Sequence, residues 1–158
     1  MSHVQRSHTI NAALAPTWAA VSKMGAVENW HPNVASEAIL SVADAGIGAS
    51  RRVEFQDGNS AVETVTEESA LEFTTMELAE VPLLKDAKVT ISTKEKGAGT
   101  TEVTFSINYG VKMGPLGWLL DAAMMKRVFG KAFESALEGL CYHLETGEFV
   151  GNTVPERS

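Results

Sequence analysis

Apolar and polar side chains alternate along the middle of the chain, from Ser36 to Val111, and this period of two is typical of β-strands. Glycine, proline and acidic residues interrupt the alternation at short intervals, which predicts tight turns and an antiparallel meander. A further strand is expected near the start of the chain, over Val4–Asn11. The strands predicted for the middle region are Ser36–Val42, Arg51–Gln56, Ala61–Thr66, Leu71–Ala79, Ala87–Lys94 and Thr101–Tyr109.

The last third of the chain has a different period. Apolar residues recur there every three or four positions, with charged residues mostly opposite, which predicts one amphipathic helix over Pro115–Thr146 ended by Gly147. Within a helix Gly130 costs about 1 kcal/mol relative to alanine, so a kink or break is expected near it. Two short helices are expected after the first strand, one beginning at Pro16 and one over Val27–Trp30.

Composition narrows the class of protein. The 158 residues, 44% apolar and 21% charged, suit one folded domain, which we expect over residues 1–150 with a frayed tail over 151–158. Thirteen Lys and Arg against twenty Asp and Glu give a formal charge of −7 without a basic cluster, which disfavours nucleic acid and anionic membrane surfaces as partners. No apolar run approaches the ~20 residues that cross a bilayer, and no secretory signal is evident. We therefore expect no membrane insertion and a soluble cytoplasmic protein.

The sequence carries no clear signal for a metal or a cofactor. Cys141 is the single cysteine, which excludes an internal disulfide and a cysteine-rich zinc site. The histidines His3, His8 and His143 are too scattered to suggest a metal site. The glycine-rich stretch 46–50 precedes a predicted strand rather than a helix, so it lacks the geometry of a phosphate loop. We expect neither a metal nor a cofactor.

Packing of the predicted elements suggests an internal cavity. The apolar face of a sheet must be covered, and the C-terminal helix is the only large element available. A strongly twisted sheet that curls around one helix need not close on it, so space for a ligand can remain. Alternation places Val53 and Phe55 on the inner face, and pairing of Val53 with Glu63 across a loop at 57–59 turns Glu63 inward. The other residues expected to line the cavity are Phe73, Thr75, Val89, Ile107 and Tyr109 from the strands and Val128, Phe129, Ala132 and Ala136 from the helix.

Polar residues in this wall are the candidates for ligand contact or catalysis. A buried carboxylate is costly unless it is paired or neutralised, and Arg51 shares the inward parity and lies diagonal to Glu63. Glu63 therefore either contacts a ligand or forms a structural ion pair with Arg51. His31 lies either at the cavity mouth or in a loop where it caps the backbone beside Pro32. Tyr109 is either a ligand contact or a core residue at a strand end.

Several short motifs succeed one another in order: Trp30-His31-Pro32, Arg51-Arg52-Val53-Glu54-Phe55 with Asp57-Gly58, Glu63, Gly114-Pro115-Leu116-Gly117 and Leu144-Glu145-Thr146-Gly147. With this order the chain resembles the polyketide cyclase/dehydrase branch of the START-like (SRPBCC) superfamily from Val4 to Glu148. The resemblance implies an α+β helix-grip fold, as in START domains and birch-pollen allergens. In this fold a curved seven-stranded antiparallel sheet wraps around a long C-terminal helix, two short helices come after the first strand, and a deep apolar cavity holds a ligand. The resemblance implies no reaction.

Plant abscisic-acid receptors are distant members of this superfamily. By this resemblance His31 and Glu63 stand near the positions of a ligand-contacting lysine and a cavity glutamate. We expect a non-catalytic binder or carrier of a small, mainly hydrophobic molecule, held by the apolar wall and oriented by His31, Glu63 and Tyr109.

Two other classes remain open. The alternative is a polyketide cyclase or dehydratase, in which His31 or Glu63 exchanges a proton and Tyr109 donates a hydrogen bond to an enolate. An interaction module would instead need a contiguous exposed apolar patch. A homodimer through the loops at the cavity mouth or an edge strand is also allowed.

Overall fold

The computed structural model describes residues 1–112, 114–120 and 124–156. Their strands form one antiparallel sheet in the order β1-β7-β6-β5-β4-β3-β2, so β1 and β2 are its edges. The strands are β1 (Ser2–Ile10), β2 (Val34–Ile39), β3 (Ser50–Phe55), β4 (Ser60–Ser69), β5 (Phe73–Ala79), β6 (Leu84–Gly97) and β7 (Thr100–Val111). The helices are α1 (Leu14–Ser22), the short 3-10 helix η1 (Val27–Asn29), α2 (Gly114–Leu120) and α3 (Lys126–Thr146).

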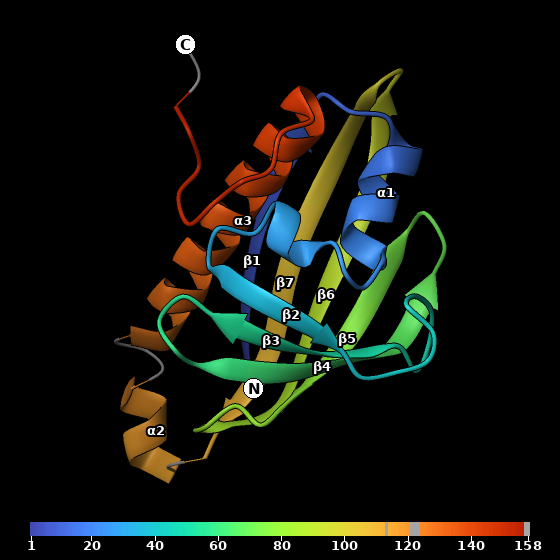
Figure 1. The fold of residues 1–158 in the computed structure, drawn as a ribbon. Coiled ribbons are helices and arrows are strands. Elements are labelled where there is room, and N and C mark those ends of the chain that lie inside the picture. Colours follow the sequence, from blue (N-terminus) through green and yellow to red (C-terminus); the bar gives the residue numbers. More distant parts are fainter. Residues whose placement is uncertain (113, 121–123, 157–158) are drawn as a thin grey trace.

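The sheet is strongly curved. In Figure 1 the strands β2, β3 and β4 cross in front of β1, β7 and β6, and α3 runs along one side of the molecule. Helix α3 packs mainly on β1 and also touches β7, while α1 covers β6 and β7. The curved seven-stranded antiparallel sheet with a long C-terminal helix and two short helices after the first strand confirms the predicted α+β architecture.

The C-terminal helical region differs from the prediction of one helix. Helix α2 ends at Leu120 and α3 begins at Lys126, while the predicted helical positions 121–123 lie outside the described residues. The helix is not broken at Gly130, because α3 continues through this residue. A Cβ at Gly130 would lie 2.5 Å from Nη2 of Arg6, so the absent side chain leaves room for the guanidinium of β1.

The β3–β4 hairpin differs from the prediction by two residues in register. The amide of Phe55 donates to the carbonyl of Asn59, so the loop is 56–58 rather than 57–59. Val53 consequently pairs with Ala61, and Arg51 pairs directly with Glu63. A shift of two residues preserves the face, so Glu63 still points inward as predicted.

On β5 the predicted inner face is wrong. Thr74 and Met76 pair with Ile91 and Val89, and on this inner face Thr74, Met76 and Ile91 are buried and Val89 is partly buried. Phe73 and Thr75 therefore point to the outer face, where Thr75 Oγ1 lies 2.8 Å from Thr90 Oγ1. The strand carries apolar side chains on both parities, so alternation along β5 alone is ambiguous.

Aromatic side chains fill much of the interior beneath α3. Phe105 of β7 lies edge-on to both Trp30 and Phe133 of α3, with ring centroids 6.0 and 5.9 Å apart. One predicted cavity residue on α3 is misplaced, because the side chain of Val128 is 55% exposed. Its neighbour Phe129 is the residue of this turn that faces the sheet.

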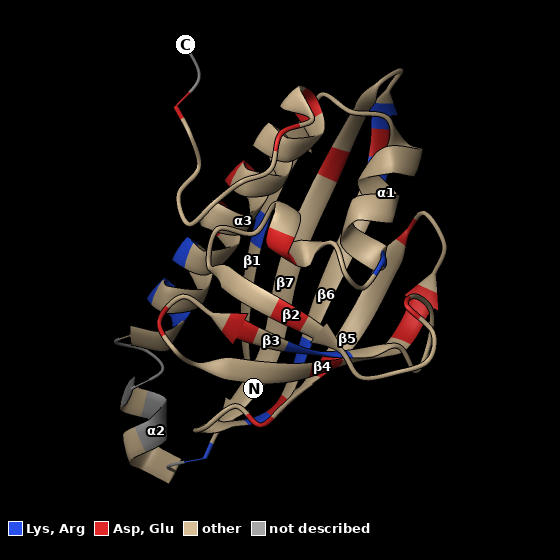
Figure 2. Ribbon diagram, viewed as in Figure 1, with Lys and Arg blue, Asp and Glu red and all other residues tan. Residues whose placement is uncertain are grey.

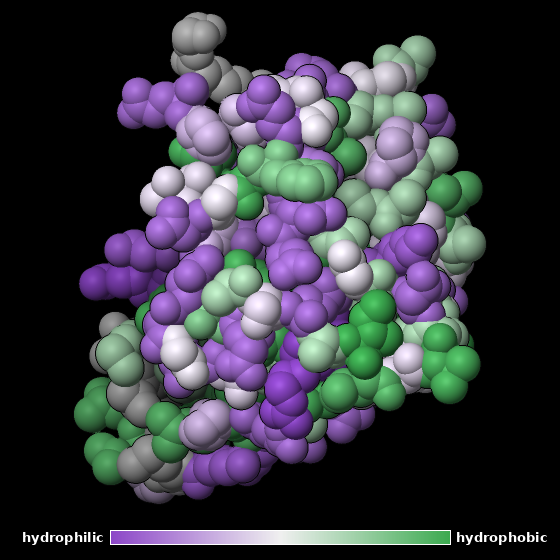
Figure 3. Space-filling model, in the orientation of Figure 1, coloured by the Kyte–Doolittle hydropathy of each residue, from purple (hydrophilic) through white to green (hydrophobic). Residues whose placement is uncertain are grey.

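Exposed hydrophobic residues concentrate at two corners of the molecule. Leu40, Val42 and Ile47 belong to the β2–β3 connection, and Leu116 and Leu119 to α2. Figure 3 shows green surface at both corners, low on the right and low on the left. Such a patch is what the interaction-module hypothesis requires. Among the described residues, none of the helices has the length and apolar character needed to span a membrane.

Candidate functional site

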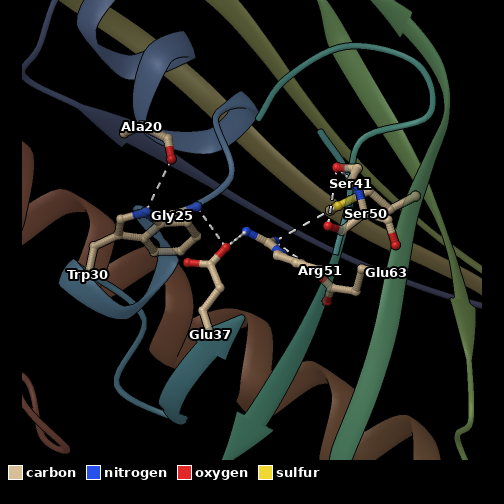
Figure 4. Close-up of polar contacts among 9 residues, drawn as sticks. Ala20, Gly25, Trp30, Glu37, Ser41, Ser50, Arg51 and Glu63 are labelled. Atoms are coloured by element: carbon tan, nitrogen blue, oxygen red, sulfur yellow. Dashed lines mark hydrogen bonds and ion pairs between the residues drawn. The ribbon is translucent and has the colours of Figure 1, made fainter. Parts of the chain in front are cut away.

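Three charged side chains from neighbouring strands meet on the inner face. Glu37 comes from β2, Arg51 from β3 and Glu63 from β4 (Figure 4). Nε and Nη2 of Arg51 both lie 2.7 Å from Oε2 of Glu63, and Nη1 lies 3.1 Å from Oε2 of Glu37. We call these three residues the charged cluster. In the ribbon of Figure 2, the red of an acidic residue on β2 lies beside the blue of the two arginines of β3.

The charged cluster is withdrawn from solvent. The side chains of Glu37, Arg51 and Glu63 are 1%, 6% and 14% exposed. Burial alone would lower the pKa of the Arg51 guanidinium, but the negative charges of Glu63 and Glu37 outweigh it and raise this pKa above its ordinary value. Arg51 is therefore a permanent cation held between two acids.

Glu37 is the site residue that the sequence analysis missed. Its Oε2 accepts hydrogen bonds from Nη1 of Arg51 and, at 2.8 Å, from the backbone amide of Gly25. Its Oε1 is buried and has no hydrogen-bond partner among the described residues. The sequence did contain a signal for Glu37, an acidic residue at an inward position of a predicted strand. The same kind of signal led to the prediction for Glu63.

His31 lies at the edge of the same region. Its ring stacks on Trp30 with centroids 5.6 Å apart, and Nδ1 accepts a hydrogen bond from the amide of Asn33. Burial, and to a smaller degree the positive charge of Arg51, lowers the pKa of His31 from 6.5 to about 4. The ring is therefore neutral at pH 7. Since Nδ1 accepts, Nε2 carries the proton.

Trp30 holds the segment that positions His31 and Glu37. Its Nε1 donates to the carbonyl of Ala20 on α1, which anchors the chain between η1 and β2. Helix α3 approaches this segment closely, because a Cβ at Gly139 would lie 2.0 Å from the carbonyl oxygen of Trp30. Glycine at this position lets α3 pack against the segment.

Most of the other predicted wall residues do face the interior. Tyr109 of β7 is fully buried, and its ring lies 5.0 Å from that of Phe129 on α3. Val53, Ile107 and Ala136 are buried, and Phe55, Val89 and Ala132 are partly buried. The structure therefore brings Arg51 and Glu63 into direct contact within a wall that is otherwise mainly apolar.

An open cleft of about 470 Å³ lies at the turn between β5 and β6. Leu78 on its wall is the cross-strand neighbour of Glu63, so the cleft borders the row that contains the charged cluster. It does not lie between the sheet and α3, where the sequence analysis expects the cavity, and that cavity stays a prediction. The cleft is lined by Leu78, Ala79, Glu80, Val81, Pro82, Leu84, Lys85, Asp86 and Lys112.

The site offers charge and hydrogen bonds rather than metal ligands. Within the described part of the chain, no group of three or more His, Cys, Asp or Glu side chains is placed to hold a metal ion. The arrangement can hold a polar group at Glu37 and surround the rest of a ligand with apolar side chains.

Known proteins share the fold of this chain. The family model described as polyketide cyclase/dehydrase and lipid transport matches residues 1–145. No curated protein matches the chain in sequence. An uncharacterised protein from Bacillus thuringiensis has a similar structure, with a TM-score of 0.75 and 17% identity over 91% of this chain and 99% of its own.

Two further solved structures are similar at the level of the fold. A START superfamily protein from Mycobacterium smegmatis has a TM-score of 0.73 and 18% identity over 90% of this chain and 97% of its own. The di-domain ARO/CYC protein BexL of the BE-7585A biosynthetic pathway has a TM-score of 0.73 and 13% identity over 92% of this chain and 47% of its own. The START-like helix-grip fold that the sequence predicts is therefore confirmed.

Proposed function

Because the chain belongs to the polyketide cyclase/dehydrase and lipid transport family, we propose that it binds and carries a small, mainly hydrophobic ligand between the inner face of its sheet and α3. The observation that carries the proposal is a mainly apolar inner face that also holds a buried charged cluster, Glu37, Arg51 and Glu63. An apolar wall with few polar groups is the usual composition of a small-molecule site.

Small side chains on α3 support this location. The partly buried Ala132 lies between Phe129 and Phe133 along α3, and the buried Ala136 follows Phe133; each alanine has only a methyl side chain. Each Å² of apolar surface that a ligand buries there contributes about 25 cal/mol to binding. The cleft at the β5–β6 turn borders the same inner row through Leu78 and would give a ligand its route inward.

Binding is tested with a fluorescent apolar probe, N-phenyl-1-naphthylamine. We expect its emission to rise on addition of the protein and an Ala132→Trp variant, which fills the proposed space, to lose this rise. Lys131→Trp, one residue away on the exposed side of α3, is the matched control and keeps it. Equal binding by both variants, with unchanged thermal unfolding, would place the probe elsewhere.

A polyketide cyclase or dehydratase is the second candidate, because the family description includes both activities and BexL shares the fold. In this function His31 or Glu63 exchanges a proton and Tyr109 stabilises an enolate. The contacts argue for binding over catalysis. Oε2 of Glu63 is already engaged by Nε and Nη2 of Arg51, and a His31 pKa of about 4 makes the ring a poor base at neutral pH.

The two candidates are separated by turnover of a poly-β-carbonyl substrate. A double variant with Glu63→Gln and His31→Ala abolishes cyclisation if these residues carry the chemistry. Activity that survives in this variant rejects their catalytic assignment, and absence of turnover in the wild type favours the carrier.

The homodimer and the cytoplasmic location remain predictions. For a dimer the structure offers the edge strand β2 and, next to it, the exposed Val42 and Ile47. We expect sedimentation to show a dimer that Ile47→Asp dissociates. A wild type that sediments as a monomer rejects this prediction without affecting ligand binding.

A further inference from the structure

We propose that the ligand of this protein carries a hydrogen-bond donor, a hydroxyl or a protonated amine, which binds Oε1 of Glu37, and that carboxylic acids are excluded. This inference rests on the proposed function, since it specifies the polar end of the molecule that the inner face would hold.

The cation of the charged cluster is already occupied. Arg51 gives Nε and Nη2 to one oxygen of Glu63 and Nη1 to one oxygen of Glu37. Its remaining contact is from Nη2 to the sulfur of Met76, at 3.9 Å. An incoming carboxylate would have to displace one of two acids that are attached to the protein itself. Arg51 therefore orients Glu37 and Glu63 rather than receiving the ligand.

The atom of the cluster that lacks a hydrogen-bond partner, Oε1 of Glu37, is an acceptor. Oε2 of Glu37 takes both of its hydrogen bonds, from Arg51 and Gly25. Oε1 is buried without a partner in the described part of the chain, on a side chain that is 1% exposed. In Figure 4 this second oxygen is turned away from Arg51, to the side where Trp30 lies. A buried acceptor without a donor is costly, so a donor is expected there.

The electrostatic balance points the same way. Two carboxylates around one guanidinium give the cluster a formal charge of −1. His31 adds no positive charge at neutral pH, because its pKa lies at about 4. A protonated amine would neutralise the excess charge, and a hydroxyl would satisfy the acceptor without adding charge. A second anion would raise the cost of burial.

The neighbours of Glu37 indicate the chemistry of the rest of the ligand. Across the sheet, Glu37 pairs with Val53 and Val53 pairs with Ala61, and both partners are buried. The donor would therefore be attached to an apolar body. The ligand class is an amphiphilic alcohol or amine.

The test compares four ten- or eleven-carbon probes in displacement of N-phenyl-1-naphthylamine at pH 7. Decanol and decylamine carry a donor, 2-undecanone is a neutral acceptor, and decanoate is an anion. We expect decanol to bind about tenfold more tightly than the ketone, and decanoate to bind most weakly, as loss of one buried hydrogen bond requires. Decanol and 2-undecanone are both neutral. A difference between their affinities therefore cannot come from attraction of a cation to the negative cluster.

A Glu37→Gln variant sharpens the test. Its amide oxygen must stay on Arg51 and Gly25, because both are donors, so the NH₂ group replaces Oε1. The free acceptor becomes a donor, which the ketone oxygen and the decanol hydroxyl oxygen can both accept, so the wild-type preference for decanol over the ketone should disappear. Glu63→Gln removes the same charge from the cluster but leaves Oε1 of Glu37 in place, so it should retain the wild-type order.

The outcomes separate the two proposals. If neither the fluorescent probe nor any of the four compounds binds, the proposed function fails and this inference with it. If all four bind alike, or decanoate binds best, ligand binding stands and the donor preference is overturned. Equal binding of decanol and the ketone, which an ordered water kept on Oε1 would produce, overturns the donor preference as well. Should Glu37→Gln fail to fold, the wild-type order of the neutral pair decides alone.

Discussion

The two halves of the inner layer use different chemistry. Where α3 lies along β1 and β7, the interior holds packed aromatic rings, including Phe105 and Phe133, which meet edge-on. Where β2, β3 and β4 cross in front, the inner face holds Glu37, Arg51 and Glu63 instead. Burial of rings stabilises a fold directly, whereas a buried ion cluster gains little over apolar side chains of the same size. Under the proposed function, the first half supports the fold and the second would serve a ligand.

The largest effect is expected where the charged half is broken. Arg51→Met leaves two buried carboxylates without their cation, so we expect the free energy of unfolding to fall by about 3–5 kcal/mol. Urea unfolding at pH 7 measures it. The control is Arg52→Met on the outer face of the same strand, whose ion pair with Glu80 is 39% and 57% exposed and is worth at most about 1 kcal/mol.

The same variant can sharpen the comparison. Combining Arg51→Met with Glu37→Leu and Glu63→Leu replaces the whole cluster by apolar side chains, and we expect most of the lost stability to return. A triple variant as unstable as Arg51→Met alone would show that the cluster is needed for folding, and the functional interpretation of this half would be wrong.

A smaller effect is expected where α3 meets the segment around Trp30. Gly139→Ala would place a Cβ 2.0 Å from the backbone oxygen of Trp30, which cannot move aside alone. We expect a loss of about 1–3 kcal/mol, which is typical of overpacking and exceeds the helical gain from alanine. Thermal unfolding checks it. Unchanged stability would mean that α3 can move away from this segment without cost.

The pH dependence of stability probes the edge of the charged half. His31 has a pKa of about 4 when folded and 6.5 when unfolded, so below pH 6.5 the unfolded chain binds the extra proton first. The contribution of His31 to the free energy of unfolding is fully present above pH 6.5 and is lost as the pH falls toward 4. Between pH 6.5 and pH 5 we expect a loss of about 1.5 kcal/mol. His31→Gln should remove this part of the pH dependence, and an unchanged curve contradicts the assignment.

The smallest effect concerns the other glycine of α3. A Cβ at Gly130 would meet only the far end of the Arg6 side chain, which can swing away because its ion pair with Glu134 is exposed. Alanine should then give a gain of at most about 1 kcal/mol from helix propensity. Gly130→Ala and Gly139→Ala thus carry opposite signs in one helix. A loss at Gly130 would show that Arg6 is held firmly.

The candidate site was only partly predictable. Alternation on β3 and β4 placed Arg51 and Glu63 on the inner face, although the pairing was wrong by two residues. The same rule was wrong for Phe73 and Thr75, because β5 carries apolar residues on both faces and only its neighbours decide between them. Glu37 was missed because its role depends on Arg51 and on the amide of Gly25, which comes from a different element.

Local sequence patterns were enough to predict the strands, the two short N-terminal helices and the order of the elements, although the C-terminal helical region was predicted as one helix rather than α2 and α3. The reason is that periodicity and turn chemistry act over a few neighbouring residues. The tertiary structure alone decided the strand register, the continuity of α3 through Gly130, and the meeting of Glu37 with Arg51. These depend on contacts between residues far apart in the chain, and such contacts exist only once the sheet has curved and α3 has packed on it.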